Sequence, residues 1–132
     1  MLRPMIDARH RWVFPDPMRL DSPAALKLTL SGRQPETCEL LWQHVPLLPH
    51  RSYRFRFRHR TAGLPPTSGI RWHILDVASP HLAGDDWQTA ELSFSSGDAS
   101  LARLSLTSER PPGYARVEGS IWLANLALEM LP

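Results

Sequence analysis

The sequence has little cysteine and no long apolar run. Cys38 is the single cysteine, which excludes an internal disulfide bond and a zinc ribbon. No stretch approaches the roughly 20 apolar residues of a membrane span, and the N-terminal MLRPMIDARHRW lacks the apolar core of a signal peptide. We therefore expect no membrane insertion. The chain is either cytoplasmic or a module of a larger protein, and as such a module it would be extracytoplasmic.

Lysine is also scarce. Lys27 is the single lysine among 15 basic residues, and the formal net charge is only +2. The high isoelectric point of about 9.2 reflects arginine, which keeps its charge over the whole accessible pH range. This mild basicity does not by itself indicate a nucleic-acid partner.

Proline and glycine are spread along the chain rather than clustered. The 132 residues include 13 prolines and 7 glycines, a distribution typical of many short elements separated by turns. With 42% hydrophobic residues and five tryptophans, the chain can bury a core of its own. We predict one all-β domain, with a loosely structured N-terminal strand and loop over residues 1–24 and a core sandwich over residues 25–131.

Apolar and polar residues alternate with a period of two in about eight segments, as expected for half-buried strands. The clearest is RSYRFRFRHRT, residues 51–61, in which the aromatic residues and His59 share one face and the arginines occupy the other. The segments are residues 10–14, 24–32, 39–47, 51–61, 70–76, 87–94, 100–106 and 119–131. Such a series predicts an antiparallel two-sheet β-sandwich of the jelly-roll type.

The last segment changes phase. Ile121 and Leu123 share one face, whereas Leu126 and Leu128 are out of step with them. A β-bulge near Ala124 and Asn125 would bring both pairs to the core. A helix is the alternative, but the alternating start after a glycine favours a strand.

Several of these segments resemble the jelly-roll carbohydrate-binding modules of the galactose-binding-domain-like superfamily. The resemblance covers about residues 25 to 131. It consists of a Gln followed by alternating apolar residues, a turn proline and a Tyr, then a Trp before a Phe, and a closing Gly with an apolar-aromatic-apolar triplet. The matching positions are Gln43, Val45, Leu47, Pro49, Tyr53, Trp87, Phe94, Gly119, Ile121, Trp122, Leu123, Asn125 and Leu126.

Two positions depart from that family. His50 stands where the family often has a glycine after the turn proline, and Ala124 stands where it often has an aspartate. In many such modules the aspartate helps to hold a structural calcium ion. Because calcium needs about six to eight oxygen ligands, we do not predict the ion here, and we expect no cofactor.

Jelly-roll order predicts a cationic face. If the second, fourth, fifth and seventh segments share a sheet, their outward residues are Lys27, Arg54, Arg56, Arg58, Arg71, His73 and Arg103. Guanidinium groups bind carboxylates and phosphates through paired hydrogen bonds, so this face suits an acidic ligand or partner. The competing interpretation is a solvated surface that discourages edge-to-edge pairing.

The same order predicts an aromatic face on the other sheet. Its outward residues are Trp42, His44, Thr89, Glu91 and Trp122. Tryptophan rings beside polar groups can stack on sugars. The tryptophans could instead dock on an adjacent domain, or lie in the core if the strand parity is shifted.

No motif indicates catalysis. The six histidines lack metal-ligand spacing, the adjacent Asp85 and Asp86 are typical of a turn, and neither a nucleophile elbow nor a phosphate-binding loop is present. The alternation in residues 51–61 buries the rings away from the arginines, which argues against stacking on nucleic-acid bases. The hypothesis is a non-catalytic module that binds a polysaccharide or oligosaccharide through a sheet face or rim loops. Its alternative is an accessory domain that packs on a neighbouring protein domain.

Overall fold

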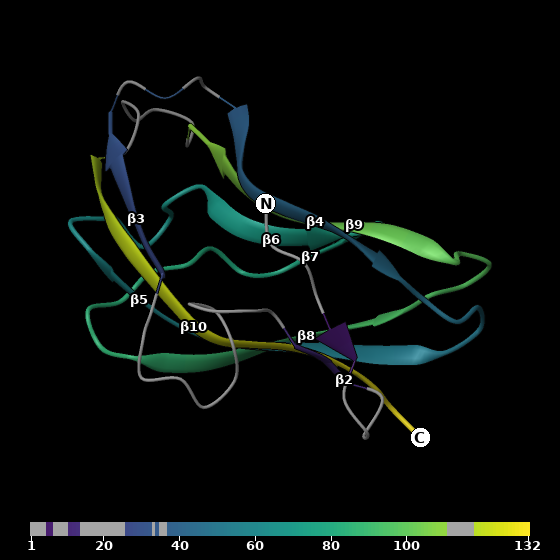
Figure 1. Ribbon diagram of the computed structural model, residues 1–132. Helices are drawn as coiled ribbons and strands as arrows, with labels where there is room; N and C mark the ends of the chain where they lie inside the picture. The colour runs from purple at the N-terminus through teal and green to yellow at the C-terminus, as the bar shows by residue number, and fades with distance from the viewer. Residues whose placement is uncertain (1–4, 7–10, 14–25, 33, 35–36, 111–117) are drawn as a thin grey trace.

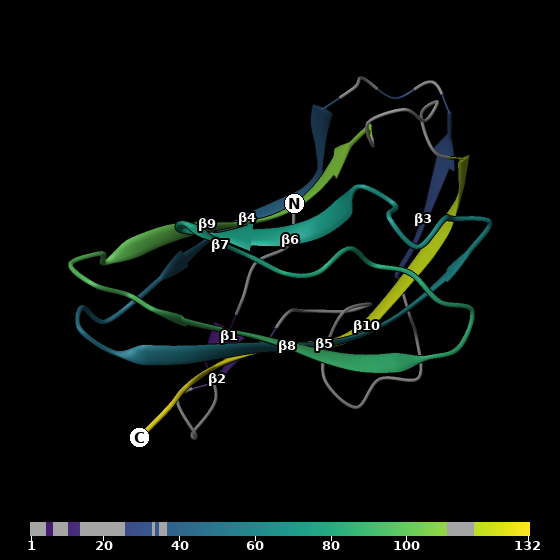
Figure 2. The same ribbon diagram turned by 180° about the vertical axis from the view of Figure 1, so that it is seen from behind.

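The computed structural model describes residues 5–6, 11–13, 26–32, 34, 37–110 and 118–132. These residues form two antiparallel sheets packed face to face, as Figures 1 and 2 show. The strands are β1 (Met5–Ile6), β2 (Arg11–Val13), β3 (Leu26–Ser31), β4 (Thr37–Pro46), β5 (Ser52–Ala62), β6 (Ile70–Ile74), β7 (Val77–Ala78), β8 (Gln88–Ser95), β9 (Leu101–Glu109) and β10 (Glu118–Met130). The predicted all-β sandwich is confirmed. No helix in the described ranges is long and apolar enough to cross a membrane.

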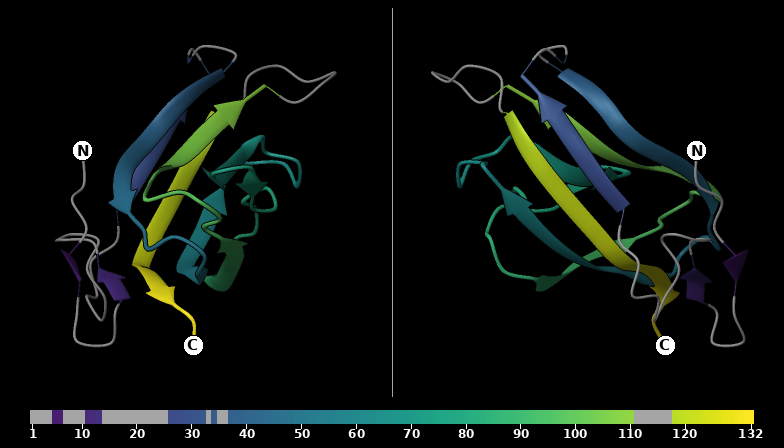
Figure 3. Two further views of the ribbon diagram at one scale, coloured as in Figure 1. Left: turned by 90° about the vertical axis from the view of Figure 1, so that its right-hand side faces the viewer. Right: turned by 60° about the vertical axis from the view of Figure 1, so that its left-hand side comes forward.

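The strand order is that of a jelly roll. One sheet has six strands in the order β1-β2-β10-β5-β8, with β3 also paired to β10, and the other has the order β4-β9-β6-β7. Strand β3 pairs with the first half of β10 and β2 with its second half, so the two lie along the same edge (Figure 3). Apart from β1, β2 and the β6–β7 step, successive strands alternate between the sheets.

The division of strands between the sheets differs from the prediction. Strands β3 and β5 belong with β10 and β8, whereas β4 belongs with β9 and β6. The prediction counts residues 10–14 as the first of eight strands and lacks β7. As a result, β3, β4, β5 and β6 are each placed one position too late in the jelly-roll order. A strand of two residues has no periodicity to detect. The observed β2 is an additional strand outside the eight that define the jelly roll.

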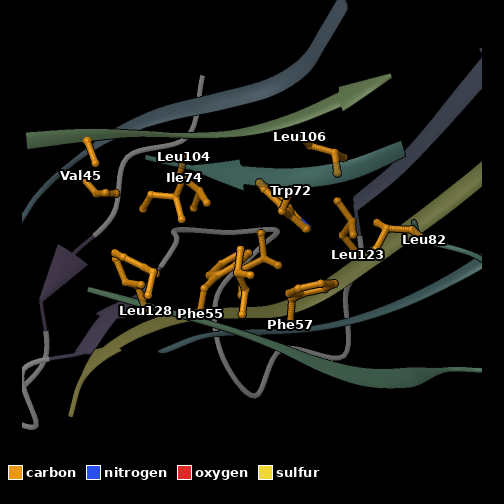
Figure 4. Close-up of a cluster of buried hydrophobic side chains, with 14 of the residues drawn as sticks. Val45, Phe55, Phe57, Trp72, Ile74, Leu82, Leu104, Leu106, Leu123 and Leu128 are labelled. Atoms are coloured by element: carbon orange, nitrogen blue, oxygen red, sulfur yellow. The ribbon is translucent and has the colours of Figure 1, made fainter. Parts of the chain in front are cut away.

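Period-two alternation places the core between the sheets. Figure 4 shows Phe55 and Phe57 from β5 directed toward Trp72 from β6. All three side chains are buried, and the Phe55 and Trp72 ring centroids lie 5.0 Å apart in an edge-to-face arrangement. Because the aromatic face of β5 fills the core, its arginines are left on the outer surface.

The predicted bulge occurs in β10. Pairing with β5 shifts register between Ala124 and Ala127, and Asn125 has a left-handed φ of 55°. Asparagine tolerates this conformation better than most residues. The shift allows Ile121, Leu123, Leu126 and Leu128 all to be buried.

The turn before β5 accommodates His50 in the place of a glycine. His50 has φ of 57°, and its backbone N–H donates to the Gly97 carbonyl at 2.6 Å. Its Nε2 lies 3.0 Å from Asp98 Oδ1. The turn therefore has the left-handed conformation that glycine adopts most readily, although the residue is histidine.

Candidate functional site

The outer face of the six-stranded sheet carries a cluster of charged, polar and aromatic side chains. Strand β5 presents its arginines there, because Tyr53, Phe55, Phe57 and His59 occupy the opposite, buried face. The register sets Arg58 opposite Thr89 and Arg56 opposite Glu91 on β8. On the other side of β5, Arg60 lies opposite Trp122 and Arg54 opposite Glu129.

The β10 bulge lies beside a hollow in this face. The hollow has a volume of about 390 Å³. Its lining residues are Arg56, Arg58, Thr89, Glu91, Asn125, Ala127 and Glu129. Ala127 has a small side chain and Asn125 sits at the register shift, so β10 is low beside the arginines of β5. The site is therefore a shallow depression with hydroxyl, amide, carboxylate and guanidinium groups.

One end of the hollow is electrically balanced. Arg56 Nη2 lies 3.0 Å from Glu91 Oε1 and 3.9 Å from Glu129 Oε1, and Arg54 Nε donates to Glu129 Oε1 at 2.9 Å. The bond to Glu129 raises the pKa of Arg54, since it favours the charged guanidinium. Two cations and two carboxylates thus cancel in charge while each fixes the orientation of the others.

Beside the hollow, cations lie over tryptophan rings. Arg60 Cζ lies 4.1 Å from the centroid of the Trp122 ring, and Lys27 Nζ lies 5.2 Å from the same ring. Arg58 Cζ lies 5.1 Å from the Trp87 ring, and Arg60 Cζ lies 5.9 Å from it. We name these five residues the cation–tryptophan ladder. Within the described ranges, no carboxylate forms an ion pair with its three cations.

The outer face of the four-stranded sheet has a different, self-contained arrangement. Arg103 Nε and Nη2 donate to the two Glu39 carboxylate oxygens at 2.8 and 2.5 Å. Its guanidinium also lies over Trp42, with Cζ 3.8 Å from the ring centroid, and His44 contacts the edge of that ring. The bond to Arg103 lowers the pKa of Glu39. One face of Trp42 is thus already covered by Arg103.

The two predicted faces are therefore wrong as groups. Lys27, Arg54, Arg56 and Arg58 lie on the six-stranded sheet, whereas Arg71, His73 and Arg103 lie on the four-stranded sheet. The tryptophans are also divided. Glu91 and Trp122 lie on the six-stranded sheet, and Trp42 and His44 lie on the other. The physical reason is the displaced strand count. It assigned β3, β4 and β5 to the wrong sheets, so their outward residues were grouped with those of the wrong neighbours.

Five residues of the six-stranded sheet's outer face were not among the residues predicted for either face. Trp87 is 38% exposed and precedes β8. Arg60 belongs to the ladder, and Asn125, Ala127 and Glu129 line the hollow. Parity along β8 carried a signal for Trp87, since it is in phase with the outward Thr89 and Glu91. The role of Asn125 depends on the register of the bulge, which periodicity does not define.

In the described part of the chain, no group of three or more histidine, cysteine, aspartate or glutamate side chains could hold a metal ion.

No protein-family model matches the chain, and no curated protein is significantly similar to it. A solved structure described as "CBM4 structure and function", a carbohydrate-binding module, superimposes with a TM-score of 0.52 at 14% sequence identity. The match covers 92% of this chain and 70% of the other. At this identity the similarity defines the fold and leaves the ligand open. The chain thus has a β-sandwich fold similar to that of this carbohydrate-binding module.

Proposed function

We propose that this domain binds a carbohydrate, without catalysing a reaction on it, through the outer face of the six-stranded sheet. The observation that carries the proposal is the hollow at the β10 bulge, whose lining residue Arg58 lies over the exposed ring of Trp87. The fold similarity to a carbohydrate-binding module supports the same reading.

Sugar recognition needs an apolar surface and fixed polar groups together. The C–H face of a pyranose packs on an aromatic ring, while its hydroxyls exchange hydrogen bonds with neighbouring side chains. Trp87 supplies the ring, and Thr89 and Asn125 supply a hydroxyl and an amide that can both donate and accept. Glu91 and Arg56 add a charged acceptor and a charged donor, each held in place by the other.

Side chains that are already held in their binding orientation favour affinity, because less conformational entropy is lost when the ligand binds. The ion pair of Arg56 with Glu91 and the contact of Arg58 with the Trp87 ring hold long side chains that would otherwise lose conformational freedom when a ligand arrives. The four-stranded sheet offers a weaker site, because Trp42 is less exposed than Trp87 and its arginine lies closer to the ring, at 3.8 Å for Arg103 against 5.1 Å for Arg58 over Trp87. The six-stranded sheet is therefore the proposed binding face.

The test compares two tryptophan variants against a panel of polysaccharides by affinity electrophoresis and titration calorimetry. Trp87→Ala is expected to weaken binding about tenfold, the equivalent of roughly 1.4 kcal/mol of lost ring contact. Trp42→Ala, the matched control on the other sheet, is expected to leave affinity unchanged. Thermal unfolding of both variants checks that each remains folded.

Two results would contradict the proposal. One is an absence of binding to every polysaccharide of the panel. The other is a loss of binding in Trp42→Ala with full affinity in Trp87→Ala, which would move the site to the four-stranded sheet.

A further inference from the structure

We infer that the carbohydrate is acidic and that Arg58 and Arg60 bind its anionic groups. This inference rests on the proposed function and adds the chemical class of the ligand. It follows from an asymmetry in charge along one sheet face. The balanced end carries Arg54 and Arg56 against Glu91 and Glu129, whereas the ladder carries Lys27, Arg58 and Arg60.

The ladder contains three positive charges without a carboxylate partner in the described ranges. Asp85 and Asp86 precede Trp87 in the chain, yet neither forms an ion pair with Arg58 or Arg60. Glu118, at the start of β10, is four residues from Trp122, which is roughly 13 Å along an extended strand. The positive charge at this end is therefore not neutralised as it is at the other.

Contact with the face of a ring leaves the N–H donors of an arginine free to bind a ligand. A guanidinium that lies over a ring uses its flat face for that contact, while its N–H donors project from its edge. Those donors suit a carboxylate or sulfate, which can accept two parallel hydrogen bonds. Trp87 and Trp122 thus hold the arginines in place without using their hydrogen-bonding capacity.

The position of the ladder connects it to the hollow. Arg58 belongs to both, since it lines the hollow and its guanidinium lies over the Trp87 ring, with Cζ 5.1 Å from the centroid. Arg60 follows two residues later on the same face of β5, a spacing of roughly 7 Å along the strand. A polysaccharide seated over Thr89 can therefore place an acidic substituent on Arg58 and continue toward Arg60.

The experiment uses ligands that differ only in charge. Polygalacturonate, alginate and hyaluronan are titrated beside the carboxyl-reduced form of each, and chondroitin sulfate beside chondroitin distinguishes sulfate from carboxylate as the anion. Neutral glucan, xylan and mannan complete the panel. We expect at least one acidic polymer to bind about tenfold or more tightly than its uncharged counterpart. Its affinity should fall as salt rises.

Two double variants distinguish binding at the ladder from nonspecific attraction between a basic protein and an acidic polymer. Arg58→Gln/Arg60→Gln is expected to abolish the preference for the acidic form. Arg51→Gln/Arg71→Gln removes the same net charge outside the ladder and should retain that preference. Thermal unfolding shows whether each double variant is folded, and the single variants Arg58→Lys and Arg60→Lys provide a milder change if one is not.

Equal loss of affinity in both double variants would mean nonspecific charge attraction and would overturn the inference. Binding to neutral polymers with no preference for acidic forms would overturn the inference while leaving the proposed function intact. No binding to any polymer would remove the proposed function and the inference with it.

Discussion

Replacing His59 with leucine should stabilise the domain. His59 lies on the buried face of β5, is 5% exposed, and packs on Phe57 with ring centroids 5.5 Å apart. Its Nδ1 is buried with no hydrogen-bond partner among the described residues. Such an unsatisfied atom costs about 1–3 kcal/mol, so removing it should raise the free energy of unfolding by about 1–2 kcal/mol at neutral pH. The melting temperature should rise by about 3–6 °C.

The gain should grow as the pH falls. Burial lowers the pKa of His59 below its ordinary value, because the charged imidazolium is poorly solvated inside the sandwich. In the unfolded chain the ring takes up a proton near pH 6.5, whereas in the folded domain it does so only at lower pH. Between those two values the unfolded state binds more protons. Stability of the natural sequence therefore declines as pH falls below about 6.5, and the variant lacks this contribution.

Urea denaturation at about pH 7.5 and about pH 5.5 measures both effects. The control is His44→Leu, since His44 is exposed on β4 and its replacement should change stability by less than about 0.5 kcal/mol. The reasoning is refuted if His59→Leu destabilises the domain at both pH values. It is also refuted if the natural sequence and the variant lose stability equally between them.

Three further substitutions test the packing and the two faces. Gly119→Ala should destabilise the domain by about 1–3 kcal/mol, because a Cβ there would lie 2.4 Å from the Ala62 carbonyl oxygen; an unchanged melting temperature would contradict this. Phe55→Ala should cost about 3–5 kcal/mol in chemical denaturation, since the ring is fully buried against Trp72, and a cost below 1 kcal/mol, roughly that of a surface change, would speak against that packing. Glu39→Gln breaks a half-exposed ion pair with Arg103 and should cost less than about 1 kcal/mol; a larger loss would give this pair an unexpected structural role.

Much of the fold could be predicted because strand parity is a local property. The alternation of residues 51–61 correctly placed the aromatic residues inward and the arginines outward, and the change of phase after Leu123 correctly indicated a bulge. Burial of Ile70, Trp72 and Ile74 likewise followed from period two. In each case the pattern reflects which side of a strand faces the core, and neighbours along the chain decide that.

The candidate site could be predicted only in part. The sequence pattern predicts that Arg56, Arg58 and Trp122 point outward. It does not show which strands lie in the same sheet and therefore which outward residues share a face. Two local errors, the counting of residues 10–14 as the first of the eight strands and the missing β7, assigned β3, β4 and β5 to the wrong sheets and so mixed the predicted cationic and aromatic groups. Hydrogen bonding between strands distant in sequence decides such groupings, and no local pattern encodes it.

The sequence by itself determined an all-β sandwich, the inward and outward side of each main strand, and the position of the bulge. The tertiary structure alone decided that Trp87 and Trp122 flank Arg60, and that Glu129 and Glu91 together neutralise Arg54. The reason is physical. Side-chain direction depends on the pleat of a single strand, but the chemistry of a face depends on the register of several strands brought together by long-range pairing.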